Sequence, residues 1–128
     1  MFEISVKTSR RVESKNITDM VLNAIRGKTG KVLYIYTPHT TCGVVINEDA
    51  DPHVMEDVME ALNRMVPRSY PYTHMEGNSD AHIKSILTGC SVTVPFSKET
   101  PVLGTWQGIF LMEFDGPRER KILITLIE

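Results

Sequence analysis

Apolar residues in this chain occur in short runs, and residues that favour turns separate the runs. From Phe2 to Thr8 apolar and polar residues alternate, which is the period of a half-buried strand. Further short runs, rich in β-branched and aromatic residues, occupy 32–37, 42–46, 91–95, 105–114 and 121–127. None approaches the roughly 20 apolar residues of a membrane-spanning helix. We therefore expect a strand-rich domain without a membrane segment.

Three other segments have helical spacing. The first begins at Thr18, a predicted N-cap, and the second begins at Asp51-Pro52 and stops before Pro67. The third begins at Asn78 or Ser79 and ends at Gly89. Its apolar residues share one side, and we expect that side to hold the helix in the core. They are Ile83, Ile86 and Leu87.

The elements together predict one α+β domain covering residues 1–128. A length of 128 residues with 41% hydrophobic residues suits a single core. The last two strands flank the tight turn Asp115–Arg118, so we expect them to pair as a hairpin. A mixed or antiparallel sheet with about three helices packed on it is the predicted architecture.

Charge and cysteine content limit the partners and the compartment. The formal net charge is -2, so no global basic field favours nucleic acid. The alternating residues from Met1 to Lys7 lack the apolar stretch of a secretory signal, and Cys42 and Cys90 form no closely spaced pair. We expect both thiols to be reduced, in the cytoplasm.

Three of the four histidines lie where sites are commonly built. His39 follows a strand, His74 lies in a loop without periodicity, and His82 lies in the first turns of the short helix. Three neutral imidazoles can bind one divalent metal and leave a position open. Their long spacing also fits three unrelated surface or hydrogen-bonded histidines. His53, away from the apolar stripe of its helix, is predicted to be solvated.

Each of several other polar residues has more than one interpretation. Glu48 is interpreted as a general base, a metal ligand or a solvated carboxylate. Asn78 begins a helix, whose free backbone N–H groups either bind an anion or form an ordinary helix cap. Arg118 and Arg120, after the turn, either bind phosphate or are solvated residues at the tip of the hairpin. Trp106 is predicted to pack in the core, and the side chain of Gln107 is then expected on the opposite face.

Several motifs occur in an order that resembles a known family. They are His39-Thr40-Thr41, Asn47-Glu48 with Asp51-Pro52, His74-Met75-Glu76-Gly77-Asn78 with Ala81-His82, Leu103-Gly104-Thr105-Trp106-Gln107, and Asp115-Gly116-Pro117-Arg118. Together they resemble the YjbQ-like family, whose members are often labelled secondary thiamine-phosphate synthases. The resemblance spans nearly the whole chain, and the Gly-Thr-Trp-Gln stretch is its most specific part.

The resemblance implies a β-sandwich-like α+β fold and a homotrimer. It implies a metal site at His39, His74 and His82, with zinc, manganese or magnesium as the ion. Glu48, Asn78 and Gln107 match other motif positions and are expected to line the site, with Arg118 binding phosphate. The predicted function is a metal-dependent enzyme acting on small phosphorylated metabolites, with a weak thiamine-phosphate synthase (transferase) activity as the specific candidate. The alternative is a non-catalytic trimeric module that binds a metal or a phosphorylated metabolite.

Overall fold

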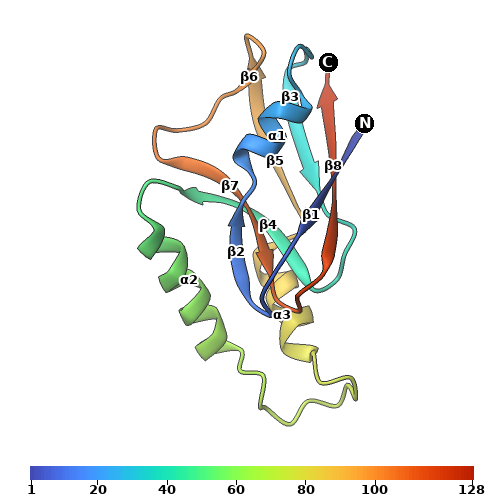
Figure 1. Ribbon diagram of the computed structural model, residues 1–128, viewed down its shortest axis with the longest axis vertical. Coiled ribbons are helices and arrows are strands. Elements are labelled where there is room, and N and C mark those ends of the chain that lie inside the picture. Colours follow the sequence, from blue (N-terminus) through green and yellow to red (C-terminus); the bar gives the residue numbers. More distant parts are fainter.

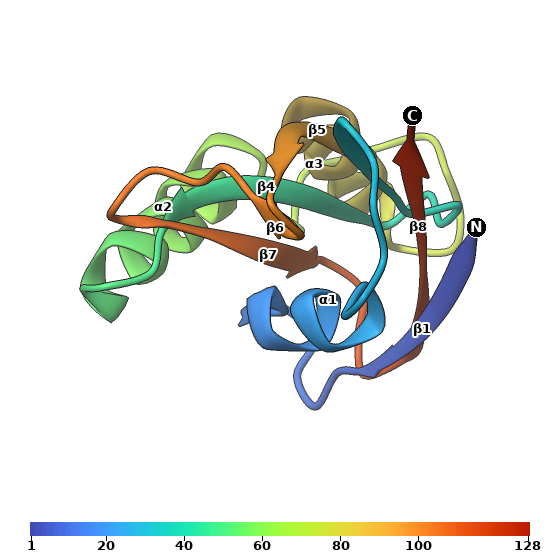
Figure 2. The same cartoon turned by 90° about the horizontal axis from the view of Figure 1, so that it is seen from above.

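The strands are divided between two antiparallel sheets. The computed structural model describes residues 1–128. The larger sheet has the order β1 (Phe2–Lys7), β8 (Glu119–Ile127), β3 (Val32–Tyr36), β5 (Ser91–Ser97) and β6 (Thr100–Pro101). The smaller sheet has the order β2 (Glu13–Asn16), β7 (Gln107–Glu113) and β4 (Cys42–Glu48). This arrangement, seen in Figure 1 and from above in Figure 2, confirms the predicted α+β class and the largely antiparallel pairing.

The main core lies between the two sheets, and α1 (Thr18–Ala24) packs into it. Alternate residues of β3 and β8 are fully buried, as a strand with one face on a core requires. Ile17, just before α1, is also fully buried, and Thr18 is the first residue of the helix rather than its cap. The principal core side chains are Val6, Ile17, Val21, Leu33, Ile35, Val44, Ile109, Leu111, Ile122 and Ile124.

The helix α2 (Pro52–Met65) covers the outer face of the smaller sheet. Its N-cap is Asp51, whose side chain accepts a hydrogen bond from the His53 N–H at 3.0 Å, as the sequence predicts. Met55 and Met59 pack with outward-facing aromatic and methionine side chains of β7 and the residue after it. Because β7 is covered on both faces, every residue from Gly108 to Glu113 is buried.

The helix α3 (Ser79–Thr88) packs against β4, but with the opposite face from the one predicted. Its buried residues are Asp80, Ala81, Lys84 and Ser85, whereas Ile83, Ile86 and Leu87 are exposed. The expectation that these three aliphatic residues hold the helix in the core is wrong.

Polar interactions explain this orientation of α3. Asp80 lies one turn before Lys84, and their side chains pair at 3.3 Å. Arg11 adds a second ion pair to Asp80 at 3.2 Å, and Lys84 donates to Oδ1 of Asn63 at 2.7 Å. The Ser85 hydroxyl donates to the Cys42 carbonyl at 2.6 Å. These contacts satisfy the buried polar groups, so the charged side of the helix can face inward.

The predicted hairpin of the last two long strands does not form. β7 pairs with β2 and β4, whereas β8 pairs with β1 and β3, so the turn between them connects the two sheets. Where a turn was predicted at 96–101, β5 and β6 form a short hairpin in which Phe96 faces Pro101. The short strand β2 was not predicted, because Glu13–Asn16 contains no apolar residue.

Both cysteines are free, with Cys42 buried and Cys90 exposed. None of the three helices has the length and hydrophobicity required to cross a membrane.

Candidate functional site

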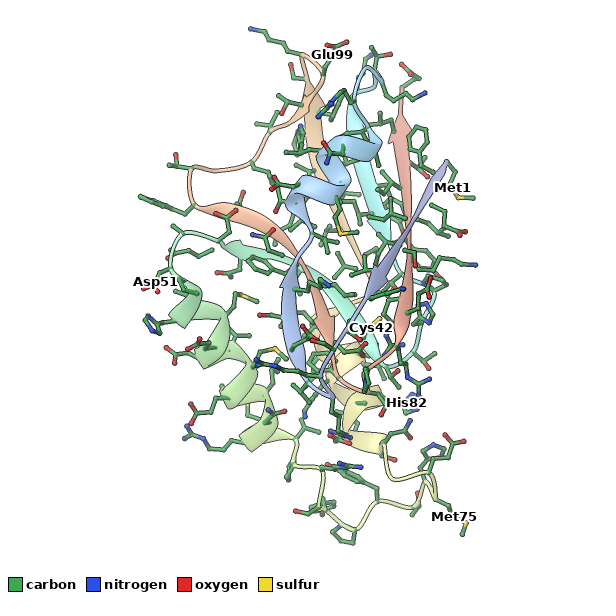
Figure 3. The ribbon with its side chains drawn as sticks, viewed as in Figure 1. Met1, Cys42, Asp51, Met75, His82 and Glu99 are labelled. Carbon is green, nitrogen blue, oxygen red and sulfur yellow. The ribbon has the colours of Figure 1, made fainter.

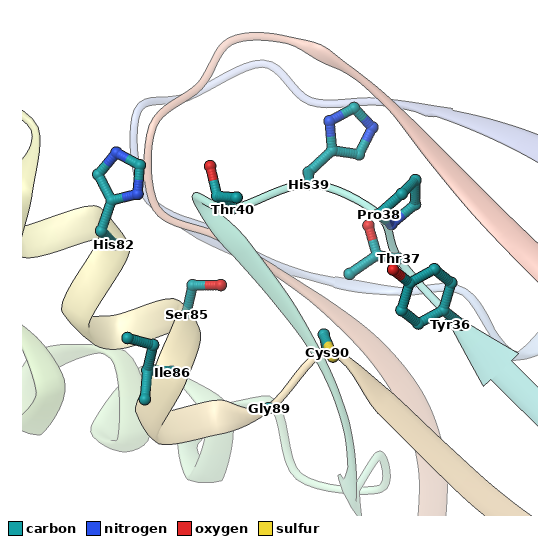
Figure 4. A pocket seen from close by; sticks show the side chains of 10 residues that line it. All are labelled: Tyr36, Thr37, Pro38, His39, Thr40, His82, Ser85, Ile86, Gly89 and Cys90. Carbon is teal, nitrogen blue, oxygen red and sulfur yellow. The ribbon is translucent and has the colours of Figure 1, made fainter.

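A hollow of about 440 Å³ lies where the β3–β4 loop meets α3. His39 and Thr40 of the loop line one side, and His82 and Ile86 of α3 line the other, with Cys90 at the base. Figure 4 shows both imidazole rings rising on the same side of the loop, with Thr40 between them. The structure therefore brings His39 and His82 to one concave surface, although they are 43 positions apart in the sequence.

His39 is held by the start of β8. Its Nε2 atom accepts a hydrogen bond from the Lys121 backbone N–H at 2.9 Å, which leaves Nδ1 as the ring nitrogen without this bond. Partial burial, followed by the nearby positive charge of Arg120, lowers the pKa of His39 below its ordinary value. The imidazole is therefore neutral at physiological pH, as an acceptor or a metal ligand must be.

His74 and His82 lie next to one another. Their ring centroids are 5.5 Å apart, with the rings edge to face at 86°. Both line a second hollow of about 460 Å³ together with Tyr72 and Ser79. Glu76 approaches Nε2 of His74 at 3.8 Å.

The His74–His82 spacing suits two ligands of one ion. Two imidazoles whose nitrogens lie about 2.0–2.1 Å from a tetrahedral zinc ion have ring centres roughly 5 Å apart. No group of three or more His, Cys, Asp or Glu side chains in the chain is arranged to hold a metal. Of the three predicted histidine ligands, the chain brings His74 and His82 together as a pair. His39 lies apart from His74 and shares the first hollow with His82.

Asn78 and Arg118 lie together at the start of α3. Asn78 is the N-cap residue, and its Nδ2 donates to Oδ2 of Asp115 at 2.9 Å. Arg118 donates to the same oxygen at 3.0 Å and to the Asp115 carbonyl at 2.8 Å. Partial burial raises the pKa of Asp115, but the hydrogen bonds from Asn78 and Arg118 outweigh it and lower the pKa below its usual value. Oδ1 of Asn78 is buried and has no partner.

Glu48 and Gln107 lie at the other end of the small sheet. They face each other across β4 and β7, whereas Cys42, close to His39 in the chain, is at the opposite end of β4. Seven strand residues span roughly 20 Å. Figure 3 shows the same separation, because Asp51, just beyond this end, lies across the molecule from His82. One chain does not bring Glu48 or Gln107 to the histidines.

Gln107 and Trp106 also differ in detail from the expectation. Oε1 of Gln107 accepts from the Gly104 N–H at 2.8 Å and so stabilises its own loop. Trp106 is 62% exposed, so the prediction that its indole packs in the core is wrong. The glycines on either side, Gly104 and Gly108, do allow a close approach: an added Cβ would lie 3.3 Å from Oε1 of Gln107 and 2.5 Å from Oδ2 of Asp49, respectively.

The expectation that Arg120 binds phosphate or is solvated is wrong, because its side chain is buried in an ion pair that the sequence interpretation missed. Arg120 and Glu113 are both buried and paired, and Thr8 and Thr41 complete their hydrogen bonds. Burial acts to lower the pKa of Arg120, but the hydrogen bond to Glu113 raises it. The alternation of Arg120, Ile122 and Ile124 along the last strand was the available signal, because it places the arginine on the core face.

Comparison with known proteins gives one consistent result. The family described as UPF0047 protein YjbQ-like matches residues 2–128. The UPF0047 protein MJ1081 of Methanocaldococcus jannaschii is 47% identical over 129 residues, covering 99% of this chain and 94% of that protein. YugU of Bacillus subtilis is 41% identical, covering 97% and 96%. The crystal structure of a YjbQ/UPF0047 protein from Clostridium acetobutylicum superimposes with a TM-score of 0.94 at 42% identity, covering 99% of this chain and 100% of that one.

Proposed function

The chain belongs to the UPF0047 YjbQ-like family, and from that premise we propose that it is a metal-dependent enzyme acting on a small phosphorylated metabolite. The observation that carries the proposal is the His74–His82 pair beside the start of α3. His82 lines both hollows, so a ligand bound in either one lies next to this ring.

His74 and His82 would hold a divalent ion of zinc, manganese or magnesium, with imidazole favouring zinc. Such an ion supplies positive charge that stabilises a departing phosphate or pyrophosphate. The His39 ring is neutral, and the hydrogen bond from the Lys121 N–H to its Nε2 atom holds it in the hollow that it shares with His82. The remaining coordination positions are left to water or to substrate oxygens.

The start of α3 and Arg118 would bind the phosphate. No side chain caps the helix, so its first backbone N–H groups are available to an anion. Asp80 in the first turn does not compete, because it is turned inward against Arg11 and Lys84. The Arg118 side chain remains 52% exposed although it is bonded to Asp115, and guanidinium is well suited to phosphate.

Thiamine-phosphate synthesis is the specific reaction we propose to assay first. It joins a pyrimidine carried on pyrophosphate to a thiazole phosphate, and both substrates bear the phosphate groups that this site suits. We place the reaction in the cytoplasm, because two free thiols fit a reducing compartment.

The second candidate is a non-catalytic trimeric module that binds a metal or a phosphorylated metabolite. One observation favours it: Glu48, the predicted base, lies at the far end of β4 from the histidines. A binding module needs the histidines but no base.

Two histidine variants test the metal site. His82→Ala should bind Zn²⁺ at least about tenfold more weakly than the unmodified protein, because one nitrogen ligand is lost. Its melting temperature should hardly change, since the helix is held by its other face. His53→Ala is the matched control, because the His53 side chain is 78% exposed and is hydrogen-bonded to Asp51 rather than placed in either hollow. Equal zinc binding by both variants, measured by titration and by metal analysis after dialysis, contradicts the metal site.

A glutamate variant separates the two candidates. Glu48→Gln should keep zinc and phosphate binding and lose turnover if the protein is an enzyme that uses this base. Full turnover by the variant excludes Glu48 as the base, and binding without turnover in the unmodified protein supports the module.

A further inference from the structure

The His39 ring lies where strand pairing in the larger sheet ends. β3 pairs with β8 only as far as Tyr36, which faces Leu123. Lys121 therefore has no partner in β3, although its backbone groups still need hydrogen bonds. The His39 ring accepts from the Lys121 N–H at 2.9 Å, and the Thr37 hydroxyl donates to the Lys121 carbonyl at 3.2 Å. The imidazole thus takes the place of the missing strand residue.

This hydrogen bond determines which nitrogen of His39 carries the proton. A backbone N–H can only donate, so the accepting nitrogen, Nε2, must hold a lone pair. A neutral imidazole has one N–H and one lone pair, so the proton of His39 lies on Nδ1. A doubly protonated ring would set two N–H groups against each other. Burial, followed by the positive charge of Arg120, lowers the pKa of the ring and disfavours that form as well.

The Nδ1 edge of the ring faces the hollow that His39 shares with His82. In Figure 4 the two nitrogens lie on opposite edges of the ring, and one of them is on the side of Thr40 and His82. Since Nε2 is bonded to the Lys121 N–H, the nitrogen on the hollow side is Nδ1. The Thr40 hydroxyl, between the two rings, is a second group that can donate. His39 therefore presents an N–H to this hollow and not a lone pair.

An N–H group suits an anion and not a metal ion. Coordination needs an unprotonated nitrogen, and the lone pair of His39 is already used by Lys121. His74 and His82, in contrast, are close enough together to share one ion. A neutral N–H held in a fixed position stabilises a negatively charged oxygen, because it needs no reorganisation when the charge arrives. The three histidines therefore differ in what they can bind.

We propose that His39 donates its Nδ1–H to an anionic oxygen of the ligand and is not a ligand of the metal ion. The inference rests on the proposed function for the identity of the anion, a phosphate group next to the ion of His74 and His82. A neutral imidazole N–H is a very weak acid, so the proton stays on the ring and the hydrogen bond alone stabilises the charge. The three-histidine metal site expected from the family resemblance then becomes a two-histidine metal site with a separate donor.

The position of the proton is measured directly by NMR. A long-range ¹H–¹⁵N spectrum of ¹⁵N-labelled protein at neutral pH distinguishes a ring protonated at Nδ1 from one protonated at Nε2. We expect the His39 signals, assigned by their loss in His39→Asn, to show the proton on Nδ1 and to keep this pattern when Zn²⁺ is added. A proton on Nε2, or a zinc-induced shift of Nδ1 to the position of a metal-bound nitrogen, overturns the proposal.

Two variants of similar size test the donor. His39→Asn keeps an N–H group near the position of Nδ1, His39→Leu has none, and both lose the Nε2 atom. Both should bind Zn²⁺ as the unmodified protein does. His39→Leu should bind inorganic phosphate at least about tenfold more weakly, because a hydrogen bond to a charged group is lost, and His39→Asn should recover most of this affinity. Calorimetric titration of zinc-loaded, dialysed protein with phosphate measures the difference.

The outcomes separate this inference from the proposed function. A loss of about tenfold in zinc affinity in both variants would identify His39 as a metal ligand and overturn the inference. Equal phosphate affinity in His39→Leu and the unmodified protein, including no measurable binding by either, would overturn it too. The zinc comparison of His82→Ala with His53→Ala tests the proposed function independently of these results. If His39→Leu does not fold, the NMR measurement on the unmodified protein still decides where the proton lies.

Discussion

His39 connects the hollow to the larger sheet through one hydrogen bond. Its Nε2 must be unprotonated to accept from the Lys121 N–H, since a protonated imidazole has no acceptor. Burial and the charge of Arg120 both favour the neutral ring. The position of this residue in the site is therefore sensitive to pH, although the residue carries no charge under ordinary conditions.

Acid should weaken the fold through His39. Because the folded state lowers the pKa of this histidine, the neutral ring contributes stability above the unfolded value of about 6.5. That contribution should be lost as the pH falls through the lower, folded pKa. NMR titration should give a midpoint below about 6.5 for His39, with the Lys121 amide signal shifting in parallel.

His39→Gln is the control for this titration, because an amide oxygen can accept the same bond at any pH. The variant should lose less unfolding free energy than the unmodified protein as the pH falls below neutrality. A His39 midpoint above that of free histidine would contradict the assigned hydrogen bond.

The docking of α3 depends on close backbone contact with β4. A Cβ atom added to Gly43 would lie 2.1 Å from Oγ1 of Thr88 and 2.9 Å from the Gly89 carbonyl oxygen. The Val44 N–H donates to the same carbonyl at 3.1 Å, so the end of the helix cannot retreat without breaking this bond.

Gly43→Ala should therefore destabilise the protein by about 1–3 kcal/mol through overpacking. Urea unfolding monitored by the fluorescence of Trp106 would measure the change. The double variant Gly43→Ala/Thr88→Ala should recover part of the loss, because the nearest clashing atom is removed. No recovery would mean that the clash with the Gly89 carbonyl dominates, and no loss in the single variant would contradict the tight packing of α3 on β4.

The local sequence predicted the three helices and the longer strands, but not the short strands β2 and β6 and not how the strands pair. Periodicity and the Asp51-Pro52 start are local signals, and α2 forms as they indicate. The hairpin failed because pairing of the last strand is decided by distant partners: Ile4 faces Ile122, and Ile35 faces Ile124. The burial of Asp80 and Lys84 depends on Arg11, which is about 70 residues away and gives no local signal.

At the scale of the whole molecule, the candidate site is divided. Four of the residues that the motifs singled out gather at the start of α3: His74, His82, Asn78 and Arg118. Glu48 and Gln107 lie at the end of β4 and β7 that is far from the histidines. The order of the motifs along the chain does not indicate this distance. That order is local information, whereas the separation of the motifs in space depends on how distant strands pair.

The two thiols of the folded chain differ in their accessibility. Cys42 is buried, and burial raises the pKa of its thiol, so it should react only after unfolding. Cys90 is exposed and lies with Ile86 in the hollow of His39 and His82, so it should react with a disulfide reagent in the native protein. Thiol titration should therefore find one reactive thiol per chain in the native protein and two in denaturant. Two fast thiols in the native protein would contradict the packing of Cys42 in the core, and fewer than two in denaturant would show that the cysteines are not free.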